Sequence, residues 1–272
     1  MRRSARVLRV VSCWLGELGS ARMRVKYPSW NSLMPQSALP QLSGDCPRRC
    51  RHCWARALSL CAALGSVELH DLEKLGKETR FAPKESLFSE DENASKVYSL
   101  TQGVARLYRP LPDGRRHVVG FALPGDFLGT TLSDRYSFSA DAITPIVACR
   151  FSKEAFSRFA EDKPNMLRRM NEFEVRELHL ARNQMLLLSS RSAEQKVALF
   201  LIGWRDRLAR LGEEPKTLPL PMKRRDIADF LGLTIETVSR TFTQLEREKV
   251  IINVPKGFRL LNLARAEALA WT

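Results

Sequence analysis

The 272-residue sequence contains no run of the roughly 18–20 consecutive apolar residues that a membrane helix requires, so no membrane partner is expected. It also contains no Gly-rich phosphate loop, no nucleophile elbow and no pair of carboxylates placed for catalysis, and an enzyme is therefore not indicated. Acidic residues are scarce at the start, where residues 1–60 hold 11 Lys and Arg against Glu17 and Asp45. The net charge of +14 is thus mostly an N-terminal feature and does not by itself indicate nucleic-acid binding.

The N-terminal stretch resembles a targeting peptide only superficially. Arg9 and Glu17 interrupt its apolar residues, and no A-x-A-like cleavage site follows. We expect residues 1–44 to be a basic disordered tail, or an over-long start assignment with Met23 or Met34 as the first residue. Without an export signal, we expect a cytoplasmic chain whose six cysteines are reduced thiols.

Residues 45–152 are expected to form a cysteine-bearing segment followed by an antiparallel β domain. Apolar spacing predicts a helix over 66–79 with Ser66 as its N-cap. Short apolar runs at 97–100, 104–108 and 117–121, separated by Gly- and Pro-containing turns, predict strands of a small barrel or sandwich.

Residues 153–190 are expected to contain a dimerisation helix, because apolar residues recur at intervals of three to five over 164–190. Such a helix would be about 40 Å long, too long for one small β domain to cover. We therefore expect its stripe to pair with the same helix of a second subunit; the alternative is burial within its own monomer. The stripe residues assigned to the dimer are Met170, Phe173, Leu178, Ala181 and Met185.

Residues 191–272 are predicted to contain a helix over 192–212, a Pro-containing linker and a winged helix-turn-helix. Gly232 provides the turn between the two helices of the motif, and Thr234 can cap the second. Apolar runs at 251–254 and 258–261 predict the hairpin of a wing. The inward residues of the two helices are predicted to be Ile227, Ala228, Leu231, Val238, Phe242 and Leu245.

The outward face of the second helix carries polar side chains suited to the major groove of double-stranded DNA. These side chains recur at helical spacing and belong to Glu236, Ser239, Arg240, Thr243 and Arg247. Arg240 can pair with guanine O6 and N7, and Glu236 can accept a hydrogen bond from cytosine N4. Lys223, Arg224 and Arg225 stand where the first helix would meet the phosphate backbone.

A β-roll, a long helix and a helix-turn-helix that reads Gly-Leu-Thr-Ile-Glu-Thr-Val-Ser-Arg resemble the Crp/Fnr family of bacterial transcription regulators. The resemblance implies an α+β fold with an N-terminal β-roll like that of cyclic-nucleotide-binding domains, a dimerisation helix and a C-terminal winged helix. The Glu236-x-x-Ser239-Arg240 pattern is similar to the Fnr branch, which implies a homodimer on a palindromic TTGAT-N₄-ATCAA-type operator and genes for low-oxygen respiration or nitrogen fixation. The loop Pro110–Arg116 is an expected contact for RNA polymerase, as equivalent loops are in relatives.

Cysteine spacing suggests a cofactor. Cys50-x₂-Cys53-x₇-Cys61 precedes the barrel and Cys149 lies near its end, and four such thiolates can hold a [4Fe-4S] cluster provided that residues 54–60 loop around it. The arrangement resembles α-proteobacterial FnrN-like proteins, which implies that oxygen converts the cluster and weakens the dimer. The alternatives are a four-cysteine zinc site, Cys61 as a small core residue, and Cys46 as a replacement ligand. Cys13 is expected to be a bystander, and haem ligation is a weaker alternative because the four histidines lack metal-ligand spacing.

Cyclic nucleotide is not an expected partner. Gly125-Asp126-Phe127-Leu128-Gly129 resembles the family's turn, but Phe138 stands where cyclic-nucleotide binders carry a phosphate-holding Arg, and Arg135 is offset by three residues. The predicted function is oxygen-responsive regulation of transcription, most simply activation. The alternatives are a cluster-free regulator of the FixK kind and an iron-sulfur or thiol oxidoreductase.

Overall fold

The computed structural model describes residues 48–130, 133–189, 192–212 and 217–271. The predicted N-terminal tail and Cys13 and Cys46 lie outside these residues. The chain enters through three short helical segments, and these are followed by a longer helix, α2 (Ser66–Leu75). The three short segments are α1 (Arg48–Arg51), η3 (Trp54–Leu58) and η4 (Leu60–Ala63).

Helix α2 is shorter than predicted, and its N-cap differs. Gly65, rather than Ser66, occupies the N-cap position, and Glu68 accepts a hydrogen bond from its backbone N–H at 2.9 Å. The helix ends at Leu75 because Gly76 adopts an extended conformation beneath Phe151, where an added Cβ would lie 2.4 Å from the ring.

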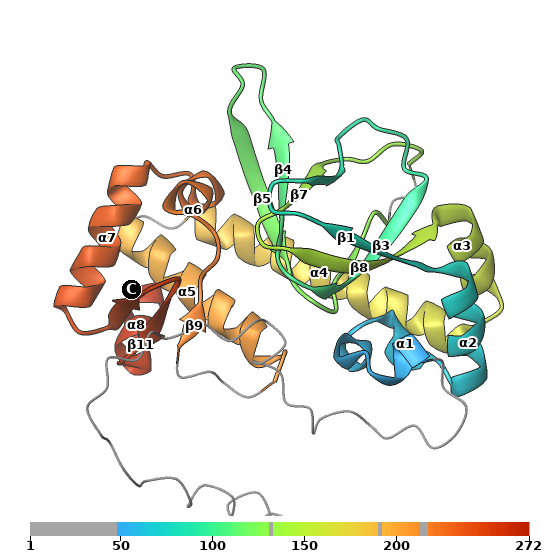
Figure 1. Cartoon of the computed structure of the whole chain (residues 1–272). Helices are drawn as coiled ribbons and strands as arrows, with labels where there is room; N and C mark the ends of the chain where they lie inside the picture. The colour runs from blue at the N-terminus through green and yellow to red at the C-terminus, as the bar shows by residue number, and fades with distance from the viewer. Residues whose placement is uncertain (1–47, 131–132, 190–191, 213–216, 272) are drawn as a thin grey trace, which may run out of the picture.

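The β domain spans 77–152 and is called the sensor domain below because a sensing role is expected for it. It is built from two four-stranded antiparallel sheets, in the orders β1-β8-β3-β6 and β2-β7-β4-β5 (Figure 1). Strands β3, β4 and β5 coincide with the three predicted runs, and the loop between β4 and β5 projects from the body of the molecule. The strands are β1 (Lys77–Phe81), β2 (Ser86–Phe88), β3 (Lys96–Gln102), β4 (Ala105–Pro110), β5 (Arg116–Ala122), β6 (Phe127–Leu128), β7 (Ser139–Ala142) and β8 (Ile146–Ser152).

Two helices follow β8 and lead out of the sensor domain. Helix α3 (Lys153–Glu161) is capped by the Ser152 hydroxyl, and α4 (Pro164–Ser189) runs behind the sheets towards the C-terminal part (Figure 1). The first half of α4 packs on η4 and α3, and Met166 and Phe173 are buried in the core that these elements share. The predicted long helix is therefore present, and its N-terminal half is anchored in its own subunit.

The C-terminal part is a helical bundle that carries a small sheet. Ser192 caps α5 (Ala193–Ala209), close to the predicted bounds, and β9 (Leu218–Pro219) adds a third strand that the sequence did not predict. The remaining elements are α6 (Arg224–Leu231), α7 (Ile235–Arg247), β10 (Ile251–Val254), β11 (Gly257–Leu260) and α8 (Leu263–Trp271). None of the helices among the described residues is long and apolar enough to cross a bilayer.

One hydrophobic core joins the sensor domain to the C-terminal part. Val118 and Phe121 of β5 belong to the same buried cluster as Phe200 and Trp204 of α5 and Ile227 of α6. The Phe121 ring lies 5.4 Å from that of Phe230 in α6. The two parts are thus packed against each other rather than separated by a solvated gap.

Candidate nucleic-acid interface and cysteine cluster

The α6–α7 pair has the local geometry of a helix-turn-helix. Gly232 ends α6 in the left-handed region at φ 63°, and the Thr234 hydroxyl caps α7 by accepting from the Thr237 backbone N–H at 3.1 Å. All six residues predicted to face inward are at most 2% exposed. The turn, the cap and the packing faces agree with the sequence prediction.

The outward face of α7 presents polar side chains to solvent. Six of them line one surface hollow: Glu236, Ser239, Arg240, Thr243, Gln244 and Arg247. Glu236 has a lowered pKa because its carboxylate accepts from its own backbone N–H and from the Thr234 side chain and lies near Arg240. The Ser239 and Thr243 hydroxyls donate to backbone carbonyls within the helix, so they present oxygen lone pairs outward.

Arg224 does not lie where a phosphate contact was predicted. Its guanidinium stacks 3.3 Å above the centre of the Phe242 ring and donates to Asn253 Oδ1 at 3.2 Å, and burial lowers its pKa to about 10. Arg224 therefore ties α6 to α7 and to the wing. Arg225 and Lys223, by contrast, are exposed.

The wing is fixed to the recognition helix by one carboxylate. Glu246 accepts from both the backbone N–H and the side-chain amide of Asn253, each at 2.9 Å, and these bonds lower its pKa. Phe258 of β11 is fully buried beneath the hairpin. The β10–β11 hairpin confirms the predicted wing.

The cysteine-bearing segment turns back on itself rather than forming one helix. Cys50 lies in α1, Cys53 at the N-cap of η3 and Cys61 in η4, where its backbone N–H donates to Ser59 Oγ at 3.2 Å. Buried Ala55 and Leu60 anchor the turns. Residues 54–60 thus form the loop that a shared ligand site requires.

Cys149 reaches the same region from the sheet. It is in β8, between Glu78 of β1 and Ser99 of β3, and it packs against the core cluster that Cys50 and Cys61 also contact. The pKa of Cys149 is raised to about 12, mainly by burial and then by the charges of Cys53 and Cys61.

The other three thiols also have pKa values raised by burial. Burial raises the pKa of Cys50 to about 12 and that of Cys53 to about 11, and in both the charge of Cys61 is the next cause. Burial also raises the pKa of Cys61 itself. Two cations oppose this trend: Arg56 lowers the pKa of Cys53 and Cys61, and Arg49 lowers that of Cys149.

The four thiols are neighbours but are not spaced around one ion. Within the described ranges there is no group of three or more Cys, His, Asp or Glu side chains that could hold a metal ion as they stand. Around a single zinc with Zn–S bonds of about 2.3 Å, tetrahedral sulfurs would lie only about 3.8 Å apart. In a four-iron cluster each thiolate binds a different iron, so its ligand sulfurs lie farther apart than those around one zinc.

The predicted dimer stripe divides between two faces of α4. Phe173 is 8% exposed in the subunit's own core, so its side chain does not face a partner, and half-buried Met170 packs against the same core. Leu178 and Met185 are 50% and 70% exposed, and Ala181 lies between them on the surface. The apolar face open to a partner continues at Leu167, Val175 and Leu188.

Aromatic side chains fill the β-roll interior. Phe88 stacks on Tyr136 with ring centres 4.1 Å apart and contacts Tyr98 and Phe138 at 6.0 and 5.8 Å. Arg135, the guanidinium nearest to the position of the phosphate-holding Arg, is exposed and donates to the backbone oxygen of Asp91.

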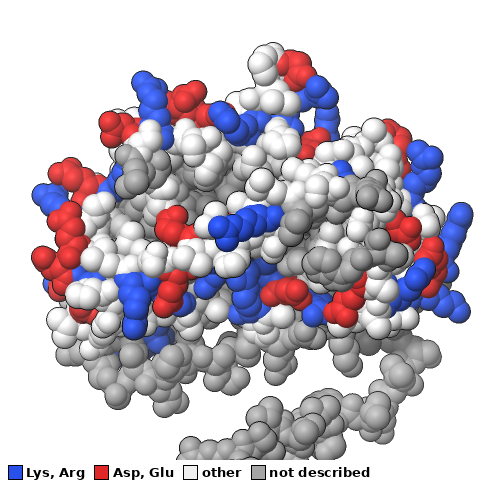
Figure 2. Space-filling view, turned by 180° about the vertical axis from the view of Figure 1, so that it is seen from behind, with Lys and Arg blue, Asp and Glu red and all other residues white. Residues whose placement is uncertain are grey.

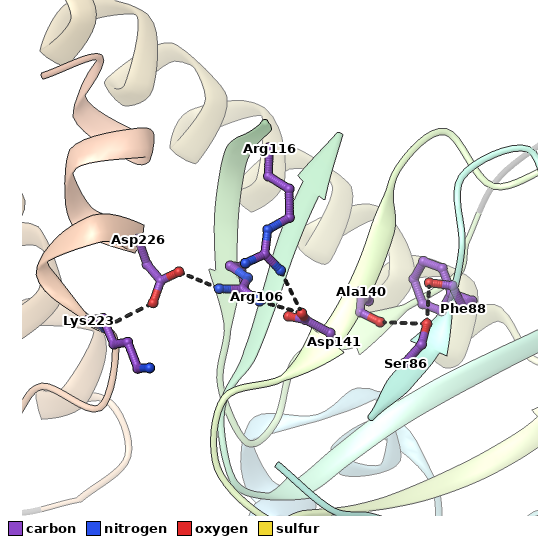
Figure 3. A network of polar contacts seen from close by, with 8 residues as sticks. All are labelled: Ser86, Phe88, Arg106, Arg116, Ala140, Asp141, Lys223 and Asp226. Atoms are coloured by element: carbon purple, nitrogen blue, oxygen red, sulfur yellow. Dashed lines mark hydrogen bonds and ion pairs between the residues drawn. The ribbon is translucent and has the colours of Figure 1, made fainter. Parts of the chain in front are cut away.

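One residue that connects the two parts of the molecule was not predicted from the sequence. Arg106 on β4 is buried and pairs with Asp141 of β7 and with Asp226 of α6, which links the sensor domain to the helix-turn-helix (Figure 3). Burial alone would lower the pKa of Arg106, but the two carboxylates outweigh it and raise the pKa. In the sequence, Arg106 stands out only as the one charged residue in the apolar run Val104–Tyr108. Nothing in the sequence identifies the two carboxylates with which it pairs.

Comparisons with known proteins agree with this architecture. A cyclic nucleotide-binding domain model matches residues 78–163, and a model of bacterial regulatory proteins of the crp family matches residues 220–251. The transcriptional activatory protein AadR of Rhodopseudomonas palustris is 58% identical over 87% of this chain and 99% of its own length. The nitrogen fixation regulation protein FixK of Bradyrhizobium diazoefficiens is 53% identical over 81% of this chain and 93% of its own.

A solved structure has the same fold. FixK2 from Bradyrhizobium japonicum superposes with a TM-score of 0.66 at 32% identity, covering 71% of this chain and 96% of that one. Since the relatives align over nearly their whole length, through both the β-roll and the DNA-reading helices, this chain belongs to the Crp/Fnr family of bacterial transcription regulators.

Proposed function

We propose that this protein is an oxygen-responsive transcription activator that binds its operator as a homodimer when Cys50, Cys53, Cys61 and Cys149 hold a [4Fe-4S] cluster. The observation that carries the proposal is that thiols from two distant parts of the chain meet in one partly buried region: Cys50, Cys61 and Cys149 pack against the same core, and the charge of Cys61 raises the pKa of Cys53 as well. When bound, such a cluster supplies a redox group that oxygen can convert.

The surroundings of the thiols suit a cluster that carries thiolate charge. Arg49 and Arg56 lower thiol pKa values on either side of the group. Arg56 is only 5% exposed, and Arg49 is held by Glu73 at 2.9 Å. These two guanidiniums offset the charge that four thiolates would otherwise accumulate in a partly buried site.

The same residues offer a route to dimerisation. Cys50, Cys61 and Cys149 contact the core that buries Met166 and Phe173, so the conformation of the cysteine segment determines how the first half of α4 is held. The exposed stripe through Leu178 and Met185 continues along that helix and is the proposed contact with a second subunit. Association would bring the two recognition helices into register with two half-sites.

Iron content of anaerobically purified protein tests the cofactor. We expect iron, inorganic sulfide and a visible absorption band, all lost in Cys149→Ser and in Cys50→Ser. Cys46→Ser is the matched control and should retain them. An iron-free protein whose anaerobic operator binding is unchanged by Cys149→Ser would contradict the proposal and favour the cluster-free regulator of the FixK kind, as in the name of one relative.

Sedimentation tests the proposed dimer. The reconstituted protein should sediment as a dimer and shift towards monomer on exposure to air, and Met185→Glu should produce monomer under both conditions. Val67→Glu is the matched control, because Val67 is 75% exposed on α2, away from the stripe. If air leaves the mass unchanged, dimer dissociation is not the mechanism.

Operator binding tests the assignment of base and phosphate contacts. Arg240→Ala should cost about 1–3 kcal/mol per half-site and relax base choice at one position. Arg225→Ala should weaken binding equally on all sequences and reduce the salt slope by about one. An equal loss on all sequences for Arg240→Ala would show that Arg240 touches only phosphate.

Two further assignments belong to the same proposal. The β4–β5 loop is the proposed contact with RNA polymerase, since it projects from the body of the molecule (Figure 1). Regulation without cyclic nucleotide is supported by the aromatic filling of the β-roll, which leaves Phe138 packed against Phe88.

A further inference from the structure

A cavity of about 190 Å³ lies where the sensor domain, α4 and α5 meet. Four arginines line it: Arg169 and Arg176 from α4, and Arg207 and Arg210 from the last turns of α5. Asp126, in the turn between β5 and β6, is the acidic residue among the lining side chains. Two helices thus bring four guanidiniums to one half-open cavity, beside the turn of the sensor domain.

The lining is only partly neutralised by the protein. Arg207 pairs with Asp126 at 2.8 Å, and Arg169 pairs with Glu172 at 2.8 Å. Arg176 lies over the Phe173 ring at 4.7 Å, and neither it nor Arg210 forms an ion pair with any residue that the structure describes.

The inner ends of two guanidiniums are sealed. The Nε atoms of Arg169 and Arg207 are shielded from solvent and have no hydrogen-bond partner among the described residues, so only the terminal nitrogens of these two side chains are available to a ligand. Burial lowers the pKa of Arg210, and the charges of Arg207 and Arg176 lower it further, more than Asp126 and Asp206 raise it. Burial raises the pKa of Glu177, and the nearby charges of Arg207 and Arg176 oppose that rise. Arg176 and Arg210, without ion pairs among the described residues, are the guanidiniums that favour an anionic ligand.

We propose that this cavity binds a small polyvalent oxyanion of the phosphate class, such as inorganic phosphate or pyrophosphate. Guanidinium groups match phosphoryl oxygens in pairs of parallel hydrogen bonds. The volume is below the roughly 300–1,000 Å³ typical of pockets for drug-sized ligands, and a phosphate or diphosphate group suits it better than a whole nucleotide. Residues 138–140, which correspond to the phosphate-holding segment of cyclic-nucleotide binders, do not line it.

The position of the cavity gives the ligand a function. An anion held by Arg176 and Arg210 would join the dimerisation helix to the helix that leads into the DNA-reading domain. It would also lie beside Arg207, whose ion pair with Asp126 already connects that helix to the sensor turn. The oxyanion would bind more tightly when α4, α5 and the sensor turn are close together than when they are apart. Binding therefore favours the close arrangement, to the extent of that difference in affinity.

Calorimetric titration of the full chain with pyrophosphate, without DNA and at constant ionic strength, tests the proposal. We expect saturable binding of one anion per chain, weakened about tenfold or more in Arg176→Gln and Arg210→Gln, because each loses charge-assisted hydrogen bonds. Arg158→Gln is the matched control, since Arg158 is exposed and pairs only with Glu154 on α3. Inorganic phosphate should compete with pyrophosphate.

Two outcomes would overturn the proposal. One is a titration without saturation, or one that Arg158→Gln weakens as much as Arg210→Gln does. The other is a reduced salt slope of operator binding in the cavity variants with no anion binding by the parent protein, which would make these arginines a DNA contact. Arg210→Lys keeps the charge but not the planar fork; if the Gln variants do not fold, it should still weaken pyrophosphate binding relative to the parent protein.

Discussion

Replacing Arg106 with Met should destabilise the protein more than any exposed ion pair does. Arg106 is 11% exposed as a side chain, and its partners Asp141 and Asp226 are each 8% exposed. Removing one partner from a buried ion pair costs about 3–5 kcal/mol, because it leaves a buried charge without compensation. Here two carboxylates, one from each part of the molecule, lose the same cation.

The remaining contacts of the two carboxylates set the size of the effect. Asp141 keeps Arg116 at 3.3 Å, and Asp226 keeps the Lys223 backbone N–H at 2.9 Å (Figure 3). We therefore expect the lower end of the range, about 3 kcal/mol in the free energy of unfolding. Arg109→Met is the matched control: Arg109 lies on the same strand, is 62% exposed and pairs with Glu90, which is 11% exposed. Its loss leaves one carboxylate rather than two without a cation, so it should cost less than Arg106→Met does.

Urea unfolding followed by circular dichroism measures the free energy of unfolding. Operator affinity reports whether the helix-turn-helix keeps its orientation relative to β4. Asp226→Asn should lower operator affinity as Arg106→Met does, because both cut the link between β4 and α6, whereas Arg109→Met should not. The reasoning is refuted if Arg106→Met costs no more than Arg109→Met, or if it lowers stability while leaving operator affinity intact.

Two further perturbations test local features. Gly125→Ala should destabilise the fold by about 1–2 kcal/mol from its left-handed backbone alone, and its Cβ, 2.7 Å from Leu58 Cβ, should loosen the cysteine segment; unchanged urea unfolding and unchanged thiol labelling would contradict this. Glu246 has a lowered folded-state pKa, so its contribution to stability is present above about pH 4.5 and is lost as pH falls through the folded value. In Glu246→Gln the temperature of the unfolding midpoint should therefore fall less steeply as the pH is lowered than it does in the parent protein. If the two proteins lose thermal stability equally at acid pH, the link from Glu246 to Asn253 does not contribute.

The helix-turn-helix was predictable because its determinants are local. Gly232 and Thr234 set the turn and the cap within three residues, and the apolar spacing of Val238, Phe242 and Leu245 defines one face without reference to the rest of the chain. The strands β3, β4 and β5 were predictable for the same reason, since turn residues mark their ends.

Features that depend on distant contacts were not predictable. Arg224 is next to exposed Arg225 in the sequence, and only the position of the wing explains why one stacks on Phe242 and the other remains in solvent. The sequence also could not show which residues of α4 face a second subunit. Phe173 and Leu178 are both apolar, and periodicity does not specify which of two apolar faces packs in its own subunit.

The distribution of surface charge does not identify the DNA-reading surface either. Lys and Arg are interleaved with Asp and Glu over the face seen in Figure 2, with no continuous basic field. The assignment rests instead on the exposed polar side of α7, where Glu236 and Arg240 share one hollow. Specific base contacts require donors and acceptors in a fixed arrangement, which net charge does not describe.

Two kinds of contact connect the sensor domain to the DNA-reading helices, and they have different consequences. The apolar contact of Phe121 with Phe230 and Trp204 resists separation but tolerates small rotations, because burial of apolar area has little directional preference. The Arg106–Asp226 pair is directional, and Asp226 also accepts from the first residue before α6. We therefore expect a rotation of the sensor sheet to strain the ion pair before it opens the apolar core, so that Arg106 orients α6 while the aromatic cluster holds the two parts together.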